Sequence, residues 1–291
     1  MSAELLPLVH RGPSPADDAH GRSRLDLFLD RLSLTPRNTD MLYMADPEPL
    51  QHETWTSWLL RRIRPTHSQR NTLLLLAFQT VILVLCYTTT ATRALVYPLF
   101  ILSTVFHEFG HALMCVVTGG HVASISVAMD ESGLTSFTGG WFCAVLPAGY
   151  LGSSLMGALL LFCGFSYRVS RFAAAGIMLI LLAVLHFAQG IYTVVCVVVL
   201  SASLAAAFLA RDGEFCQHIV LFLGAASSMA AMLDILESTV LEVIVGSDAQ
   251  QFADHCSVVL PPTLFGAAWF VLSTLLIGAS ILAGLIAFKF K

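Results

Sequence analysis

The residues best suited to chemistry in this chain are His107, Glu108 and His111, which form the pattern His-Glu-x-x-His. Residues i and i+4 of an α-helix lie on the same face, so both imidazoles can bind one zinc ion. Zinc acidifies a water bound to it, and Glu108 is positioned to take that proton and deliver it to a leaving amine. Random placement gives this pattern an expected count of about 0.01 in such a chain. The spacing therefore predicts a hydrolytic zinc site.

The surroundings of the pattern strengthen this prediction. His107, Glu108 and His111 interrupt an otherwise apolar segment, residues 94–118. Burying charged groups in hydrocarbon costs at least about 2.5 kcal/mol each. Metal binding explains their presence there better than the alternative, a polar packing cluster without metal.

A catalytic zinc site usually has three protein ligands and one open position, so the third ligand must come from another segment. The favoured candidate is Asp234, because the small residues at 224–228 allow another helix to approach closely. Glu237, one turn later on the same face, is the rival ligand. The remaining candidates, which we interpret first as interfacial or interhelical hydrogen-bonding residues, are His186, His218 and Asp248.

The composition indicates which elements must position these residues. Of the 291 residues, 56% are hydrophobic and only 12% are charged, whereas soluble globular chains carry about 25% charged residues. Charged residues concentrate in residues 1–71, which we expect to be a polar, largely disordered arm with an aromatic and basic interfacial segment near its end. Residues 72–291 form the predicted transmembrane domain. The net charge of −4 gives no basic patch for nucleic acid.

Apolar runs long enough to cross a bilayer predict six or seven transmembrane helices, and thus an all-α polytopic membrane protein. One run contains two spans, with a break near Gln189 and Gly190. The runs are residues 71–92, 94–118, 139–164, 172–211, 215–245 and 262–288.

Residues 119–140, between the second and third predicted spans, have a different pattern. Apolar and small polar residues alternate over 122–129, and Asp130–Gly133 supplies turn residues before a second short run. This pattern predicts a short β-hairpin.

The chain has seven cysteines, an odd number. No two of them form a Cys-x-x-Cys pattern, and most lie inside apolar runs. We therefore expect neither a disulfide framework nor a structural zinc knuckle.

Together, the His107–His111 motif, the Gly-flanked hairpin, the segment Pro147–Ser153 and a later intramembrane aspartate resemble the site-2 protease family of intramembrane zinc metallopeptidases. The match looks closest to the compact, M-fifty B-like branch and extends from about Thr72 to Phe288. One departure concerns the third ligand: better-studied members have Leu-Asp-Gly or Asn-Pro-Asp-Gly, whereas Asp234 stands between Leu233 and Ile235.

The resemblance implies that zinc is bound by His107, His111 and Asp234, with Glu108 as general base. It also implies cleavage of peptide bonds in or near the transmembrane segments of membrane-protein substrates. The expected location is an integral, multi-pass position in the lipid bilayer, in an endomembrane if the organism is eukaryotic.

Two other function classes remain open. A zinc transporter is disfavoured because Ala112, rather than a second carboxylate, follows the motif. A catalytically silent scaffold of the same fold would keep the motif without cleaving substrates.

Overall fold

The computed structural model describes residues 54–209, 215–241, 245–256 and 260–289. The part of the predicted polar arm that spans residues 1–53 lies outside these ranges. Within them the chain is almost entirely helical, with one small two-stranded sheet.

Six described helices are long and apolar enough to cross a membrane, which confirms the predicted class of fold. One of them, α8, continues without a break into a π-helical segment, η4 (Leu236–Leu241). The six are α3 (His67–Thr88), α4 (Thr90–Val117), α5 (Phe142–Gly164), α6 (Tyr167–Phe187), α8 (Cys216–Ile235) and α10 (Pro262–Ala287).

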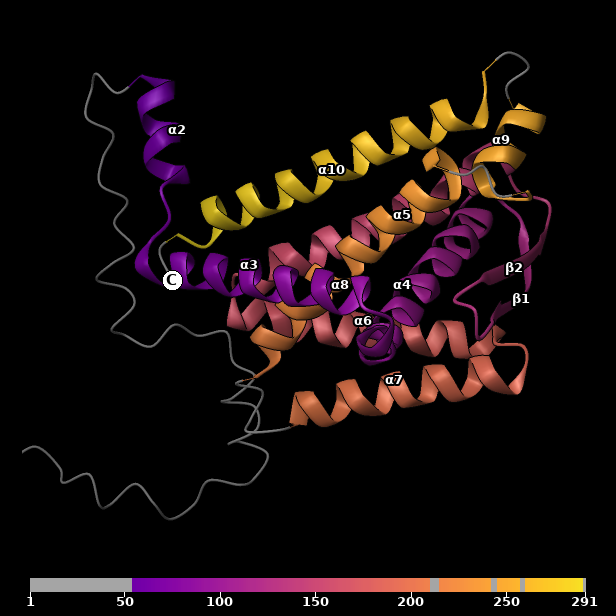
Figure 1. Cartoon of the computed structure of the whole chain (residues 1–291), viewed down its shortest axis with the longest axis horizontal. Helices are drawn as coiled ribbons and strands as arrows, with labels where there is room; N and C mark the ends of the chain where they lie inside the picture. The colour runs from indigo at the N-terminus through magenta and orange to yellow at the C-terminus, as the bar shows by residue number, and fades with distance from the viewer. Residues whose placement is uncertain (1–53, 210–214, 242–244, 257–259, 290–291) are drawn as a thin grey trace, which may run out of the picture. The chain divides into compact units, whose positions relative to one another are not determined.

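A seventh apolar helix, α7 (Ile191–Leu209), is shorter in its apolar part, Ile191–Ala206. The chain breaks between α6 and α7 at the predicted place, where Gly190 has a φ of 85°. Glycine reaches such left-handed conformations readily because it has no Cβ. The reversal lets α7 return along α6 (Figure 1).

Two short helices lie outside the membrane-spanning set. The first, α2 (Trp55–Ile63), contains the predicted aromatic and basic segment, and the guanidinium of Arg62 lies 5.4 Å from the ring centre of Trp58. The second, α9 (Asp248–Cys256), precedes α10 and lies at the same end of the helices as the sheet (Figure 1).

The predicted hairpin is confirmed between α4 and α5. It consists of β1 (His121–Val127) and β2 (Gly133–Thr138), paired antiparallel. The outer edge of β1 is covered, because the Gln189 N–H donates to the Ile125 carbonyl at 2.8 Å. No other strand in the described residues pairs with β2, so its outer edge stays open.

The central helix is α5, which packs against α4, α8 and α10. Glycines make these contacts close: a Cβ on Gly110 of α4 would lie 2.2 Å from the Ala148 carbonyl oxygen of α5. A Cβ on Gly157 would lie 2.8 Å from the backbone nitrogen of Ser228 on α8. Gly149, Ser153 and Gly157 follow one another at intervals of four residues along α5, and this stripe of small residues is a packing face, as such stripes in membrane helices usually are.

The expectation of no disulfide is wrong at one pair. Cys143 and Cys256 form a bond that links the first turn of α5 to the last residue of α9, across 113 residues of sequence. Cysteine spacing could not show this pair, because the fold alone brings the two helix ends together. The other five cysteines are free.

Candidate metal centre

The two histidines of the motif lie on one face of α4, as their spacing predicts. Their ring centres are 4.7 Å apart with the planes at 76°. His107 is 9% exposed and His111 is 7% exposed. Both side chains are thus held inside the helix bundle, where a bound ion would be shielded from bulk water.

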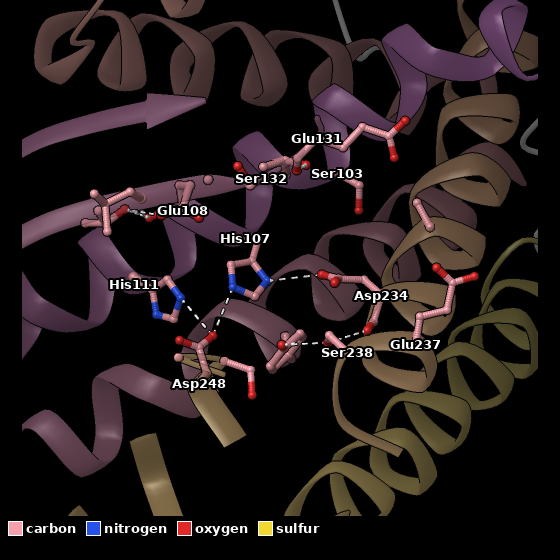
Figure 2. A pocket seen from close by; sticks show the side chains of 18 of the residues that line it. Ser103, His107, Glu108, His111, Glu131, Ser132, Asp234, Glu237, Ser238 and Asp248 are labelled. Carbon is pink, nitrogen blue, oxygen red and sulfur yellow. Dashed lines mark hydrogen bonds and ion pairs between the residues drawn. The ribbon is translucent and has the colours of Figure 1, made fainter. Parts of the chain in front are cut away.

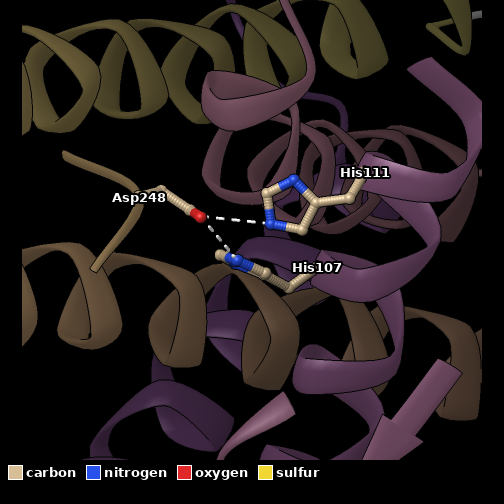
Figure 3. Close-up of side chains that lie close together, drawn as sticks. All are labelled: His107, His111 and Asp248. Carbon is tan, nitrogen blue, oxygen red and sulfur yellow. Dashed lines mark hydrogen bonds and ion pairs between the residues drawn. The ribbon is translucent and has the colours of Figure 1, made fainter. Parts of the chain in front are cut away.

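A third potential ligand comes from the first residue of α9. One carboxylate oxygen of Asp248, Oδ2, lies 3.0 Å from Nε2 of His107 and 3.1 Å from Nε2 of His111 (Figure 3). The ligand atoms of these three residues all lie within 4.8 Å of one another. The group therefore has the number and type of donors that a catalytic zinc ion takes from protein.

Asp234, the favoured third ligand from the sequence, lies behind His107 and outside this group. Its Oδ2 is 3.7 Å from Nδ1 of His107, the ring nitrogen that points away from Asp248 (Figure 2). The Asp234 side chain is 51% exposed because it faces a cavity. Its position suits a carboxylate that orients a histidine ligand from its second nitrogen.

The other candidates do not join the group. Glu237 accepts a hydrogen bond from the Tyr87 hydroxyl at 2.5 Å. The ring of His186 lies against Phe187, and His218 is exposed. Among the lesser candidates, only Asp248 reaches the histidines.

Hydrogen bonding of His111 indicates what the site binds. Its Nδ1 lies 2.8 Å from the Val145 carbonyl oxygen, which can only accept, so Nδ1 carries the proton. In the neutral ring Nε2 then presents a lone pair, and it faces an Asp248 oxygen that is also an acceptor. Two acceptors at 3.1 Å need a positive charge between or beside them, which is a proton when His111 is an imidazolium and a metal ion when the ring is neutral. A metal cation meets this need.

The charge state of Asp248 fits the same interpretation. Burial alone would raise its pKa, but the neighbouring imidazoles of His111 and His107 hold the pKa well below its usual range. The side chain is therefore ionised, which is the form that binds metal.

Gly149 leaves the space that an ion would need. A Cβ on this residue would lie 2.4 Å from Nε2 of both His107 and His111. The backbone of α5 thus passes directly beside both donor nitrogens, and only glycine allows it. In addition, Nδ1 of His107 is buried without a hydrogen-bond partner among the described residues, and the Asp234 carboxylate, 3.7 Å away, faces it without bonding to it. The donor set and its surroundings fit a zinc ion.

Glu108 points to the other side of α4, toward the hairpin. The Thr135 hydroxyl donates to Glu108 Oε2 at 2.6 Å, and Glu108 is only 4% exposed. Gly133 lies so close to this side chain that a Cβ added to it would be 2.2 Å from Glu108 Oε1. Strand β2 therefore fixes the orientation of this carboxylate, which lines the same cavity as the histidines.

These groups share a cavity of about 540 Å³. Figure 2 shows His107, Asp234 and Asp248 facing its interior. The lining includes His107, Glu108, His111, Thr135, Asp234 and Asp248. The cavity thus brings the buried Glu108 carboxylate together with three side chains that could bind a metal ion, and it leaves room for a peptide segment.

The sequence favoured His107, His111, Glu108 and Asp234 and gave Asp248 a lower rank, whereas the structure brings Asp248, and not Asp234, to Nε2 of both histidines. The available signal for Asp248 was its position directly after Gly246 and Ser247, at the start of a short polar helix. The prediction looked instead for an acid within an apolar span.

One of three comparisons with known proteins finds a match. Neither the curated proteins nor the solved structures match the chain. A family model described as Peptidase M50B-like matches residues 75–280, more than half of the chain. This stretch contains the histidine pair, Glu108, Asp234 and Asp248. The chain is an integral, multi-pass membrane protein and belongs to the M50B-like branch of the site-2 protease family.

Proposed function

We propose that this chain is a zinc-dependent intramembrane endopeptidase that hydrolyses peptide bonds in or near transmembrane segments of other membrane proteins. The observation that carries the proposal is the grouping of His107, His111 and Asp248 in one cavity with Glu108. Membership of a peptidase family supports it.

The residues that would hold the zinc ion are His107, His111 and Asp248. We assign Asp234 the role of orienting His107 through Nδ1, in place of the ligand role expected from the sequence. When bound, zinc supplies a Lewis acid that polarises the scissile carbonyl and acidifies water.

Glu108 is the proposed general base. It takes a proton from the attacking water and gives it to the nitrogen of the cleaved peptide bond. The hydrogen bond from Thr135 keeps its carboxylate in one orientation. The low exposure of Glu108 keeps bulk water from competing for the proton.

The open edge of β2 is the proposed binding place for the substrate. A transmembrane segment must unwind locally before its peptide bonds can be attacked, and the freed backbone groups then need partners inside the membrane. Strand addition to β2 would supply those partners. Leu134 is 63% exposed and, with Gly133 and Thr135, lines the cavity along this edge.

The proposal is tested by comparing wild type with Glu108→Gln, each as the full chain in cells that lack the native protein. We expect Glu108→Gln to keep its zinc and to accumulate uncut membrane proteins, measured by quantitative proteomics of the membrane fraction. Equal amounts of cleaved substrate in both strains would contradict the general-base role. A wild-type protein without zinc, and with an unchanged proteome, would favour a scaffold. Zinc uptake into vesicles that depends on the chain would favour a transporter.

A further inference from the structure

The proposed ligand Asp248 lies on α9, a helix too short to be stable without contacts to its neighbours. Helix α9 has nine residues, and isolated helices shorter than about 12 residues are marginal in water. The histidines, by contrast, belong to a 28-residue membrane helix. The location of the carboxylate therefore depends on how α9 is attached to its neighbours.

Apolar contacts attach the middle of α9 to α10. Phe252 contacts Phe265 with ring centres 4.8 Å apart and Trp269 at 5.8 Å. Ala249 is completely buried and Ala253 is 8% exposed. Helix α9 also packs against α5, where Tyr150 belongs to the same buried cluster as Ala249. None of these apolar contacts fixes the last residue of α9 covalently.

The disulfide supplies that covalent bond. Cys256 is the last residue of α9, eight residues after Asp248, or about 12 Å along the helix. It is bonded to Cys143, and beside this bond the ring of His255 lies 5.4 Å from Phe142. The end of α9 opposite the carboxylate is thereby tied to α5.

The same part of α5 orients the histidines. Val145, two residues after Cys143, accepts the hydrogen bond from Nδ1 of His111. Gly149, one further turn along, lies beside Nε2 of both rings. One covalent bond thus joins the helix that positions the imidazoles to the helix that carries the carboxylate.

We propose that the Cys143–Cys256 disulfide is a positioning element of the metal centre, which holds Asp248 against His107 and His111 and makes zinc affinity depend on the redox state of this pair. The inference rests on the metal site of the proposed function. A dithiol reductant would donate two electrons and two protons, so that the S–S bond becomes two thiols and the dithiol becomes a disulfide. The reduced protein keeps both histidines and the non-covalent contacts of α9 with α5 and α10, but it loses the covalent bond between α9 and α5.

The experiment uses the full chain in detergent, with zinc affinity measured by competition against a chelating dye. Mass spectrometry of a non-reducing digest must first detect the peptide pair linked through Cys143 and Cys256. We expect the Cys143→Ala/Cys256→Ala variant to bind zinc at least about tenfold more weakly, as with other groups that orient metal ligands. The matched control, Cys86→Ser/Cys163→Ser, removes two free thiols and should bind zinc as wild type does.

A mutant cycle distinguishes positioning from general destabilisation. In an Asp248→Ala background, loss of the disulfide should weaken zinc binding no further, because the bond acts through that carboxylate. An equal further loss in that background would overturn the proposal, and so would wild-type affinity in the cysteine variant or absence of the linked peptide.

Reduction and reoxidation of the wild-type protein test the same dependence without any substitution. If the double cysteine variant does not fold, wild type can be reduced with a dithiol, freed of reductant without air and assayed. Its affinity should fall and should return on reoxidation, and an affinity that does not change overturns the proposal. A wild-type protein that binds no zinc in any state would overturn the metal site of the proposed function, whereas unchanged affinity on reduction overturns this inference alone.

Discussion

One carboxylate oxygen of Asp248 lies 3.0 Å from Nε2 of His107, although 141 residues separate the two in sequence. The same oxygen lies 3.1 Å from Nε2 of His111. Asp248 and Asp234 thus occupy different positions at the histidine pair, since Asp234 approaches only Nδ1 of His107.

Alanine substitution should separate the two aspartates. Asp248→Ala removes a donor atom, so we expect zinc to be lost during purification, while the weaker binding by His107 and His111 can still be titrated. Asp234→Ala removes only an orienting group, so zinc affinity should fall about 10- to 100-fold while one zinc still binds at saturation. Elemental analysis and a titration measure both quantities. Asp254→Ala, on the exposed side of the same helix, is the matched control. If Asp234→Ala lost zinc while Asp248→Ala kept it, the assignment would be reversed.

Gly149→Ala should abolish zinc binding. The added Cβ would lie 2.4 Å from Nε2 of both histidines, closer than any real contact, so the rings or the helix must move. The control is Gly176→Ala in α6, where nothing lies within 4 Å of an added Cβ. It should bind zinc normally and be equally or slightly more stable, because alanine favours helices by up to about 1 kcal/mol. Normal zinc content in Gly149→Ala would show that α5 does not confine the site.

Thr135 should affect catalysis without affecting the metal. Thr135→Val removes the hydrogen bond to Glu108, and hydrogen bonds to charged groups are worth about 1.5–3 kcal/mol. Cleavage of any substrate found by proteomics should fall about 10- to 100-fold, with zinc content unchanged. Thr135→Ser keeps the hydroxyl and should recover most of the rate. Equal rates in the valine and serine variants would argue against the hydrogen bond.

Metal removal should lower stability. A ligand that binds only the folded state, present at about 100 times its Kd, stabilises that state by about 2.7 kcal/mol. Chelator treatment should therefore lower the thermal midpoint of wild type, and added zinc should restore it. Asp248→Ala should show no such response at the same zinc concentration. Differential scanning fluorimetry in detergent measures both, and a zinc response in Asp248→Ala equal to that of wild type would count against the ligand role.

The sequence alone predicted most of the fold, because each long apolar run is a local property. The break at Gly190 and the hairpin after α4 were predicted for the same reason: turn residues and alternation act over a few positions. Likewise, His107 and His111 share a face through helix geometry alone.

Two features could not be predicted in this way, because both depend on where α9 docks. Asp248 and Cys256 lie on a polar nine-residue helix whose sequence does not indicate its neighbours. Burial of Ala249 and contacts of Phe252 with Trp269 decide its place. The sequence favoured Asp234, which lies within an apolar span, and that position brings it to Nδ1 of His107, the ring nitrogen that faces away from Asp248.

The distance in sequence between the histidines and Asp248 also bears on biosynthesis. The ribosome makes His107 and His111 with the second long apolar helix, but Asp248 only after the fifth, and Cys256 later still. A growing chain therefore holds an incomplete donor set until nearly all of its helices have been inserted. For the proposed peptidase, hydrolytic competence would then arise only at the end of assembly.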